Sequence, residues 1–424
     1  MITLVIGGGG REHALALALS LDPVVTEVHA APGNPGMAAC ATLHEVDIMD
    51  GTAVASLAAA VGADLVVVGP EAPLTAGVAD AVRRAGMACF GPTTEAAVLE
   101  GSKAFAKDVM AAAGVPTAAA RLCATEAEAA AALDEFGAPY VVKDDGLAAG
   151  KGVVVTDDRA AALDHALACG RVVVEEYLDG PEVSLFAITD GSAVLPLRPA
   201  QDFKRIHNGD LGANTGGMGA YTPLPWAPPD LVDEVSERVL QPTVDEMARR
   251  GTPFQGLLYA GLALTSRGLR VVEFNARFGD PETQPLLALL DPSGPGLGAV
   301  LLAAAQGRLR EVLRESGPLR FRDAAAVAVV MASRGYPESS SKGDLITGIA
   351  DAEALEGVTV LHAGTGLAED GSLVTAGGRV LAVVGVAPTL AEARSRAYAG
   401  VSKIDFPGKQ FRTDIAGAAA HTPT

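Results

Sequence analysis

Short apolar runs alternate with helix-like segments over the first hundred residues. Each run is followed by a turn rich in glycine or proline, and the intervening residues 12–21 have the alanine and leucine content of a helix. Strands that alternate with helices predict a parallel sheet with right-handed crossovers. Because ligands of such sheets bind at the carboxyl ends of the strands, these turns are expected to line a site. The predicted strands are residues 2–6, 24–30, 65–68 and 87–90.

The glycine run at residues 7–10 leaves two interpretations open. A dinucleotide-binding Gly-x-Gly-x-x-Gly motif would need glycine at position 12 or 13, where Glu12 and His13 stand, so that motif fits poorly. The run either lets a phosphate approach the N-terminus of the following helix or only makes a tight strand-to-helix turn.

The composition shifts after residue 101, where two helices are predicted. The first covers residues 102–114 and carries Lys103 and Lys107 on one face, because they are four residues apart. The second begins at a Thr-x-x-Glu capping box at residues 125–128 and ends near residue 136.

A glycine- and lysine-bearing hairpin is predicted next. Residues 140–143 and 153–156 have strand patterns, and the loop between them is rich in glycine and carries Lys151. The loop is not a Walker A motif, because Gly152 stands where Ser or Thr is required and a strand follows where a helix should. We interpret the tip of this hairpin as a cover for phosphates.

Two further strands, at residues 171–177 and 183–188, enclose an acidic segment. An adenine often hydrogen-bonds the backbone at such a strand exit, and a carboxylate a few residues later, here Glu182, can accept ribose hydroxyls. The alternative for Glu175 and Glu176 is an ordinary solvated strand end.

Residues 201–221 contain five glycines among small polar residues, and we expect a long functional loop there. Residues 214–217 offer successive N–H groups for an anion, and Lys204 and Arg205 add positive charge nearby. An amphipathic helix is predicted to follow at residues 231–250.

The most informative segment lies at residues 271–284. Residues 256–264 and 269–274 predict a hairpin whose second strand presents Glu273 and Asn275 on one face, with Arg277 on the same parity. A carboxylate and an amide oxygen suit a hard cation such as Mg²⁺, and the adjacent arginine indicates phosphoryl-transfer chemistry. The alternative is an edge strand followed by a charged turn.

A third module of about 100 residues begins near residue 324, mostly strands with one helix. The helix is predicted at residues 389–402, behind a second capping box, and the small polar residues after about 415 are expected to fray. The predicted strands are residues 324–332, 358–363, 373–375 and 379–386.

Composition restricts the class of protein. The 424 residues exceed one ordinary domain, and 49% hydrophobic content allows sizeable cores. A formal net charge of −19 argues against a nucleic-acid or membrane-surface partner. The four cysteines have no metal-type spacing and are expected to be buried free thiols, and no apolar run approaches a membrane span. We therefore expect a soluble cytoplasmic protein.

Several of these segments together resemble a known family. In chain order they are Val-Val-Lys with the glycine-lysine hairpin, Glu-Glu-Tyr-Leu, Asn-Thr-Gly-Gly-Met-Gly-Ala-Tyr, and Arg-Phe-Gly-Asp-Pro-Glu-Thr-Gln. The sequence looks like the phosphoribosylamine–glycine ligase (glycinamide ribonucleotide synthetase) family of the ATP-grasp superfamily. The likeness covers essentially the whole chain, including Arg-Ala-Tyr-x-x-Val-x-Lys-Ile at residues 396–404.

The resemblance implies a multi-domain α/β fold and a reaction. Residues 1–101 would form an N-terminal parallel α/β domain and residues 102–323 a two-lobed ATP-grasp domain, with a small mobile lobe at about 118–190. Residues 324–424 would form a mostly-β α+β domain. The family joins glycine to 5-phosphoribosylamine with ATP in purine biosynthesis, through glycyl phosphate. A monomer or weak homodimer is expected.

The resemblance also assigns roles to individual residues. Contacts with ATP fall to Lys103, Lys143, Gly146, Gly150, Gly152, Glu175, Glu176, Leu178 and Glu182. Catalytic roles fall to Arg277, as stabiliser of the moving phosphoryl group, and to Lys151 and Asp280. Binding of Mg²⁺ or Mn²⁺ falls to Glu273 and Asn275. Substrate contacts fall to Gly9, Pro35, Glu71, Asp210, Asn214, Thr215, Gly216, Gly217 and Glu282.

Three positions depart from the family pattern. Asp144 stands where alanine is usual, Phe203 where histidine is common and Ala213 where proline is common. Strand alternation places Asp144 opposite Lys143, so we expect its side chain to point away from the phosphates. Phe203 puts one possible phosphate contact in doubt.

Three alternative functions are weaker. The Asp-Pro-Glu-Thr-Gln turn disfavours a carboxylase or formate-dependent transformylase of the same superfamily. The broken glycine spacing disfavours a nucleotide-binding oxidoreductase. The intact set of Lys143, Lys151, Glu273, Asn275 and Arg277 disfavours an inactive scaffold protein.

Overall fold

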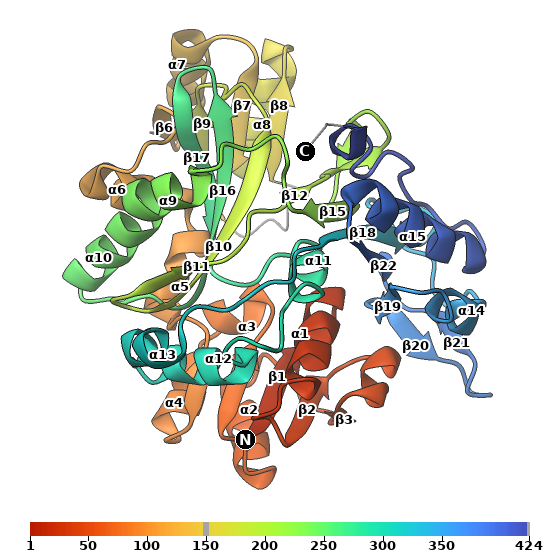
Figure 1. Ribbon diagram of the computed structural model, residues 1–424. Coiled ribbons are helices and arrows are strands. Elements are labelled where there is room, and N and C mark those ends of the chain that lie inside the picture. Colours follow the sequence, from red (N-terminus) through yellow and green to blue (C-terminus); the bar gives the residue numbers. More distant parts are fainter. Residues whose placement is uncertain (147–151, 422–424) are drawn as a thin grey trace.

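The first hundred residues form a parallel sheet in the computed structural model, which describes residues 1–146 and 152–421 (Figure 1). Its strands are β1 (Ile2–Gly7), β2 (Glu27–Pro32), β3 (Thr42–Leu43), β4 (Leu65–Val68) and β5 (Ala88–Phe90), in the order β3-β2-β1-β4-β5. All neighbouring pairs are parallel, as predicted. Its helices are α1 (Gly10–Ser20), α2 (Gly51–Ala60), α3 (Glu71–Thr75), α4 (Val78–Arg84) and α5 (Thr94–Gly101).

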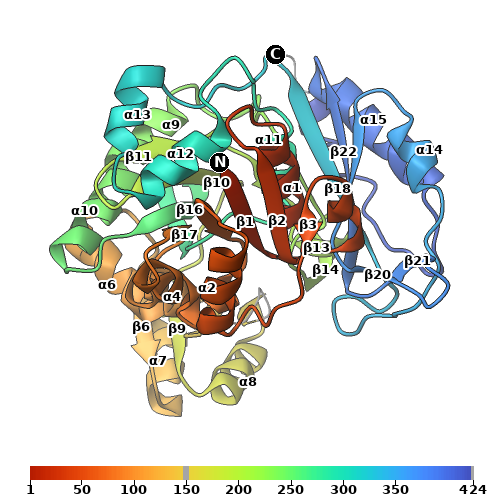
Figure 2. The ribbon, with the colours of Figure 1, turned by 90° about the horizontal axis from the view of Figure 1, so that it is seen from below.

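Alternation along β1 explains why both faces of this sheet are covered. Leu4 and Ile6 belong to a cluster with apolar side chains of α2 and α4, whereas Val5 belongs to a cluster with those of α1 and α12 (Leu297–Ala305). Successive strand residues point to opposite faces, so one apolar run serves two helical layers. Figure 2 shows this sheet and its helices from below.

The central region contains two antiparallel sheets. The smaller has the order β6-β9-β7-β8 and is covered by α7 (Glu126–Phe136) and α8 (Arg159–Cys169). The larger has the order β11-β10-β16-β17. The strands of the smaller sheet are β6 (Ala120–Cys123), β7 (Tyr140–Asp144), β8 (Val153–Thr156) and β9 (Val172–Glu175). Those of the larger are β10 (Glu182–Asp190), β11 (Val194–Pro196), β16 (Gln255–Thr265) and β17 (Gly268–Asn275).

Helices border these central sheets. The continuous helix predicted at residues 231–250 is found as α9 (Leu231–Val235), a π-helical turn (Ser236–Leu240) and α10 (Gln241–Arg249). Ser102 caps α6 by accepting from the Phe105 N–H at 3.1 Å. The other helices are α6 (Lys103–Ala113), α11 (Thr283–Leu287) and α13 (Leu309–Ser316).

The last sheet combines strands from two distant parts of the chain. Its order is β12-β15-β18-β22-β19, and β15 pairs antiparallel with β18. Its strands are β12 (Gln201–Asp202), β15 (Gly219–Thr222), β18 (Ala325–Ala332), β19 (Val358–His362) and β22 (Arg379–Ala387). Nearby lie β13 (Arg205–His207) with β14 (Leu211–Asn214), β20 (Thr365–Leu367) with β21 (Leu373–Thr375), α14 (Ile349–Glu353) and α15 (Leu390–Lys403).

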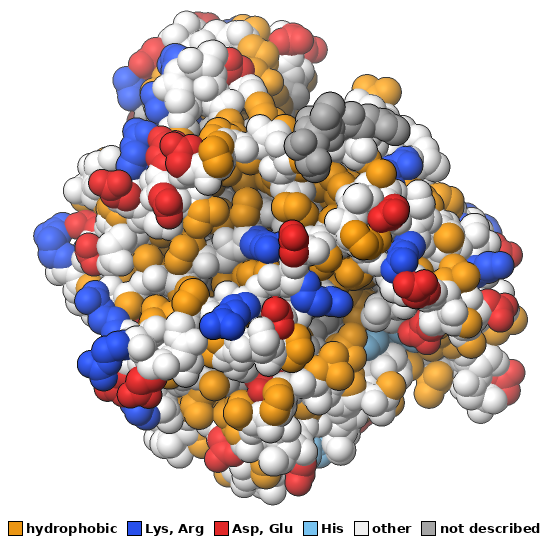
Figure 3. Space-filling model, viewed as in Figure 1, with side chains coloured by type: hydrophobic (Ala, Val, Ile, Leu, Met, Phe, Trp, Pro, Cys, Tyr) orange, Lys and Arg blue, Asp and Glu red, His pale blue; other side chains and the backbone are white. Residues whose placement is uncertain are grey.

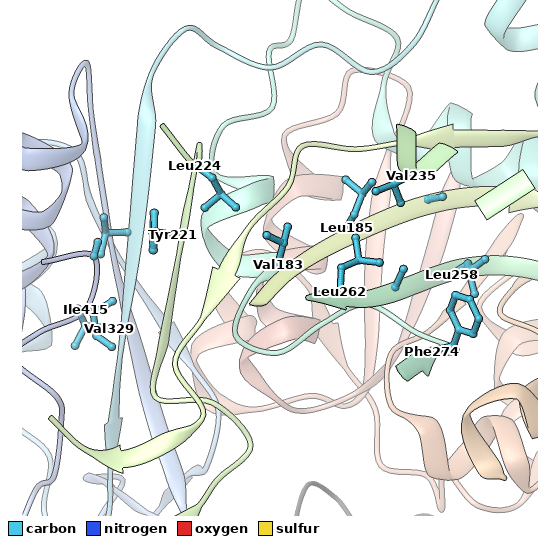
Figure 4. Close-up of a cluster of buried hydrophobic side chains, with 14 of the residues drawn as sticks. Val183, Leu185, Tyr221, Leu224, Val235, Leu258, Leu262, Phe274, Val329 and Ile415 are labelled. Carbon is cyan, nitrogen blue, oxygen red and sulfur yellow. The ribbon is translucent and has the colours of Figure 1, made fainter. Parts of the chain in front are cut away.

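One apolar cluster runs from the larger central sheet into this last sheet. Figure 4 shows Val183, Leu262 and Phe274 of the central sheet in the same cluster as Val329 of β18 and Ile415 near the end of the chain. A shared core of this kind joins the two regions, because separating them would expose apolar surface to water. The predicted α/β multi-domain architecture is confirmed.

Three local predictions are wrong. The strand predicted at residues 24–30 begins only at Glu27, because the Asp22 carboxylate accepts the Val24 N–H at 3.0 Å and closes a turn. Residues 201–221 are not one loop, because much of the segment forms short strands with partners that include distant β18. Fraying after residue 415 is not found as far as His421, since Ile415 and Ala419 are buried.

The cysteines and the surface carry few special features. All four cysteines are free, and two of them, Cys40 and Cys169, are only half-buried rather than buried as expected. On the face drawn in Figure 3, acidic and basic side chains are interspersed among apolar ones. Within the described part of the chain, none of the helices has the length and apolarity needed to cross a membrane.

Candidate active site

The end of β17 carries the candidate metal ligands. Glu273 and Asn275 are half-buried on either side of buried Phe274, as the two-residue period predicted. Gly261 of β16 lies directly across from Glu273, and its missing side chain leaves room for the carboxylate. Among the described residues no hydrogen bond or ion pair engages the Glu273 carboxylate, nor do three metal-type side chains cluster anywhere. Two oxygen donors fit a hard cation that takes its remaining ligands from phosphates and water.

Two lysines and a buried glutamate connect the two central sheets behind this strand. Lys143 of β7 contacts Glu175 at 2.8 Å and donates to the Val272 carbonyl of β17 at 3.0 Å. Lys107 of α6 contacts the other oxygen of Glu175 at 3.0 Å. Burial opposes ionisation of Glu175, but Lys143 and Lys107 outweigh it and lower the pKa of Glu175. Burial likewise opposes the charge on Lys143, yet Glu175 and Glu273 raise the pKa of Lys143.

The described base of the glycine-lysine hairpin is tied to the start of α6. Lys103 donates to the Gly146 carbonyl at 3.0 Å, and the Ala104 N–H donates to the Asp145 carboxylate at 2.9 Å. On the opposite side, the Gly152 carbonyl accepts the Asp144 N–H at 2.8 Å. The predicted ATP and catalytic residues Gly150 and Lys151 lie outside the described residues. Lys103, Lys143, Gly146 and Gly152 are thus gathered at one end of the small sheet.

The predicted adenine and ribose residues follow β9. Leu178 is half-buried just after the strand, whereas the Glu176 carboxylate is already held by Arg267 at 2.9 Å and by the Ala119 N–H at 3.0 Å. Glu182 at the start of β10 forms an ion pair with Lys204, which lowers the pKa of Glu182. The carboxylate of Glu182 near the end of β9 is therefore already paired with the ammonium group of Lys204.

Arg277 is enclosed by carboxylates from the N-terminal region. Its Nε lies 3.0 Å from Glu71 and its Nη2 lies 3.2 Å from Glu100. It also donates to the Phe278 carbonyl at 3.2 Å. Burial opposes the charge on Arg277, but Glu100 and Glu71 raise its pKa further above its ordinary range. The guanidinium is therefore always charged and is fixed beside Asn275, whose Oδ1 lies 3.4 Å from Nη2.

The acidic turn after β17 meets the C-terminal region. The Asp280 carboxylate contacts Arg379 at 3.0 Å and accepts from Gln284 at 2.7 Å. Burial opposes ionisation, yet Arg379 lowers the pKa of Asp280. A side chain added at Gly9 would lie 3.6 Å from the same carboxylate, so the glycine run of the first sheet closes onto this turn. Glu282 is 3% exposed and accepts from Tyr259 at 2.6 Å, so a substrate contact there would have to displace a hydrogen bond.

Three family models match the chain in order along its length. The phosphoribosylglycinamide synthetase N domain matches residues 1–100, the ATP-grasp (A) domain residues 101–283, and the C domain residues 326–418. The chain belongs to the phosphoribosylglycinamide synthetase family.

Individual relatives of this family agree over the full length. The phosphoribosylamine–glycine ligase of Streptomyces coelicolor is 65% identical over 422 residues, which cover 99% of this chain and all of that one. The crystal structure of the phosphoribosylamine–glycine ligase of Thermotoga maritima matches with a TM-score of 0.84 and 34% identity, covering 98% of this chain and 100% of the other. A biotin carboxylase domain of Hydrogenobacter thermophilus 2-oxoglutarate carboxylase, at TM-score 0.71 and 17% identity over 97% and 91%, shares the fold alone.

The family's Asn-Thr-Gly-Gly segment differs from its sequence-based interpretation. Three of its backbone N–H groups have partners within the protein: that of Thr215 donates to the Lys204 carbonyl at 2.8 Å, and that of Gly217 to the Thr215 hydroxyl at 3.0 Å. The Gly216 N–H donates to the Tyr336 hydroxyl at 2.9 Å. These N–H groups have partners within the protein because the segment folds back on β13 and on the C-terminal region. An anion site at residues 214–217 stays a prediction. The Asn214 side chain donates to the Val153 carbonyl of β8 at 3.5 Å.

Two other predicted substrate residues lie differently in this family member. Asp210 contacts Arg412 at 2.6 Å and lines a cavity of about 660 Å³ with Phe203 and Tyr221. Neither Arg277 nor Gly9 is among the residues that line this cavity. Pro35 begins a short 3-10 helix beside the glycine run, where Asn34 donates to the Gly8 carbonyl at 2.9 Å.

The family member's unusual Asp144 faces away from Lys143. It lies near Cys169 of α8, on the helix-covered side of β7. Burial is the main cause that raises the pKa of the Cys169 thiol, and the charge of Asp144 raises it further. We expect Asp144→Ala to change the KM for ATP by no more than about twofold, since the side chain lies on the face of β7 opposite to Lys143. Initial rates over a range of ATP concentrations would measure this. A large fall in KM would show that the side chain faces the phosphates.

Sequence reasoning missed three residues that hold predicted site residues in place. Lys107 had a signal, because it shares a helix face with Lys103, but nothing local indicated its partner Glu175. Glu100 and Arg379 had no local signal, since they meet Arg277 and Asp280 only through the tertiary fold.

Proposed function

We propose that the chain joins glycine to 5-phospho-D-ribosylamine at the expense of ATP, giving glycinamide ribonucleotide, ADP and phosphate in purine biosynthesis. The observation that carries this proposal is the full-length likeness to ligases of that name, at 65% identity over 99% of the chain. It is supported by the gathering of Lys143, Glu273, Asn275 and Arg277 where the two central sheets meet.

The proposed reaction has two chemical steps. A carboxylate oxygen of glycine attacks the γ-phosphorus of ATP, the bond to the β-phosphate oxygen breaks, and ADP leaves. The amine nitrogen of phosphoribosylamine then attacks the carbonyl carbon of glycyl phosphate, phosphate leaves, and the nitrogen loses a proton as the amide forms. Neither step needs a protein nucleophile, so the protein contributes positioning and charge stabilisation.

Each site residue has a proposed role that follows from its position in the fold. Lys103 and Lys143 contact the phosphates or the adenine of ATP at the end of the small sheet, and the backbone around Leu178 holds adenine. Arg277 faces the transferring phosphoryl group, where its planar fork suits equatorial oxygens. Gly9, Pro35 and Glu71 contact phosphoribosylamine from the N-terminal region.

Glu273 and Asn275 would hold the divalent cation. Their oxygens suit Mg²⁺, with Mn²⁺ as an alternative, and such a cation neutralises phosphate charge when bound. We further propose residues 1–101, 102–323 and 324–424 as the domains, and a cytoplasmic monomer or weak homodimer that acts only on small molecules.

Phosphate release from ATP tests this function. With phosphoribosylamine present, we expect rapid release with glycine, and release at least about tenfold slower with alanine or with no amino acid, because an extra methyl group in a tight pocket costs roughly this factor. A coupled assay for inorganic phosphate would follow the reaction. Equal release with all three mixtures would contradict a glycine ligase.

A further inference from the structure

Two carboxylates of the N-terminal region hold the same arginine in different ways. Glu71, the first residue of α3, contacts Nε of Arg277, and its side chain is 28% exposed. Glu100, in the last turn of α5, contacts Nη2, and its side chain is 9% exposed. Of these two partners of Arg277, Glu71 is thus the more exposed to solvent and Glu100 the more buried.

Glu100 also holds the backbone on which Arg277 is mounted. Its second oxygen accepts the Ala276 N–H at 2.7 Å, while its first contacts the guanidinium at 3.2 Å. A single carboxylate therefore fixes both the main chain just after Asn275 and the direction of the Arg277 side chain. The contact joins residues 176 positions apart, so it depends on the docking of the N-terminal region against β17.

The local position of Glu100 does not favour a carboxylate. The C-terminal turn of a helix carries partial negative charge, which disfavours an acidic side chain there. Burial adds a desolvation cost for the charged form. A residue that both its helix and its burial disfavour is best explained by the contacts it makes with Arg277 and Ala276.

We infer that Glu100 is a positioning residue that orients Arg277 toward the transferring phosphoryl group. The inference rests on the proposed function, because it gives Arg277 that role. Glu71 is the exchangeable partner: when phosphoribosylamine engages it, Arg277 loses its contact at Nε but keeps Glu100 at Nη2. The Arg277 side chain thus keeps its orientation through Glu100 when the substrate replaces its contact with Glu71.

Glutamine in place of Glu100 tests this role, with Glu95→Gln as the matched control. Glu95 is exposed on the same helix. We expect Glu100→Gln to lower kcat about 10- to 100-fold, the loss typical of a small misplacement of a reacting group, with KM for ATP changed less than about threefold. Glu100→Asp should recover part of the rate, and Glu95→Gln should match the unaltered protein. Thermal unfolding would confirm that the variants fold, and if Glu100→Gln does not, Glu100→Asp decides by the same split between kcat and KM.

A double-mutant cycle separates this inference from the proposed function. If Glu100 acts through Arg277, the pair Glu100→Gln with Arg277→Lys should be no slower than Arg277→Lys alone. Multiplied losses, or an unchanged kcat in Glu100→Gln, would overturn the positioning role while leaving the function intact. A normal rate in Arg277→Lys itself would instead overturn the proposed role of Arg277.

Discussion

Replacing Glu273 by alanine is expected to lower kcat at saturating ATP and Mg²⁺ by about 10³-fold or more, or roughly 4 kcal/mol of transition-state stabilisation. Glu273 is the one carboxylate of the candidate metal pair, and Asn275 alone supplies only a neutral oxygen. The remaining charges also shift, because Glu273 helps to raise the pKa of Lys143 and Lys204. Without Glu273, Lys103 and Lys143 remain near the ATP, but the divalent cation that accompanies the phosphates has no carboxylate ligand from this strand.

Folding should survive this change. Glu273 is half-buried with Gly261 opposite, and no described residue is left without a hydrogen-bond partner when it is removed, so we expect the free energy of unfolding to fall by only about 1 kcal/mol. The measurement is turnover as a function of Mg²⁺ concentration, with Glu237→Ala, an exposed glutamate, as control. A variant that keeps its turnover and its Mg²⁺ dependence would exclude Glu273 as the metal ligand.

The strand that carries Glu273 illustrates what could be predicted from sequence. The apolar pattern predicts its hairpin at residues 256–264 and 269–274, and the two strands are found at Gln255–Thr265 and Gly268–Asn275. The two-residue period and the capping boxes act over a few residues, so they can be recognised without knowing the rest of the fold. Thr125 and Thr389 accordingly cap the helices expected of them.

Predictions failed where the partner is distant in the chain. The glycine-rich segment at residues 201–221 lacks strand propensity, but β15 pairs with β18, more than a hundred residues later. The same pairing brings Tyr336 to Gly216 and occupies an N–H that was expected to bind an anion. Arg379 reaches Asp280 across 99 residues for the same reason. Propensity and pattern describe a segment, whereas these contacts depend on how the segments dock.

Replacing Arg277 by lysine is expected to lower kcat by about 10²- to 10³-fold with little change in the KM for ATP. The guanidinium uses Nε for Glu71 and Nη2 for Glu100, and a lysine ammonium cannot occupy both positions while also facing a phosphoryl group. One enclosed carboxylate would then lose its partner, which costs free energy in addition to the misplaced charge. The loss belongs to kcat because the contact matters most as charge moves in the transition state.

Single-turnover kinetics decide whether this loss lies in the chemistry. With enzyme in excess over ATP, the rate of ADP formation reports phosphoryl transfer and excludes slow product release. Arg270→Lys is the matched control, because Arg270 lies on the same strand and, among the described residues, its side chain donates a hydrogen bond to the neighbouring Leu269 carbonyl at 2.9 Å rather than to Glu71 or Glu100. A slow first turnover in Arg277→Lys beside a normal one in Arg270→Lys places Arg277 at the phosphoryl group. If the first turnover of Arg277→Lys is normal but its steady-state turnover is slow, Arg277 acts in product release. The guanidinium would then be needed after phosphoryl transfer rather than during it.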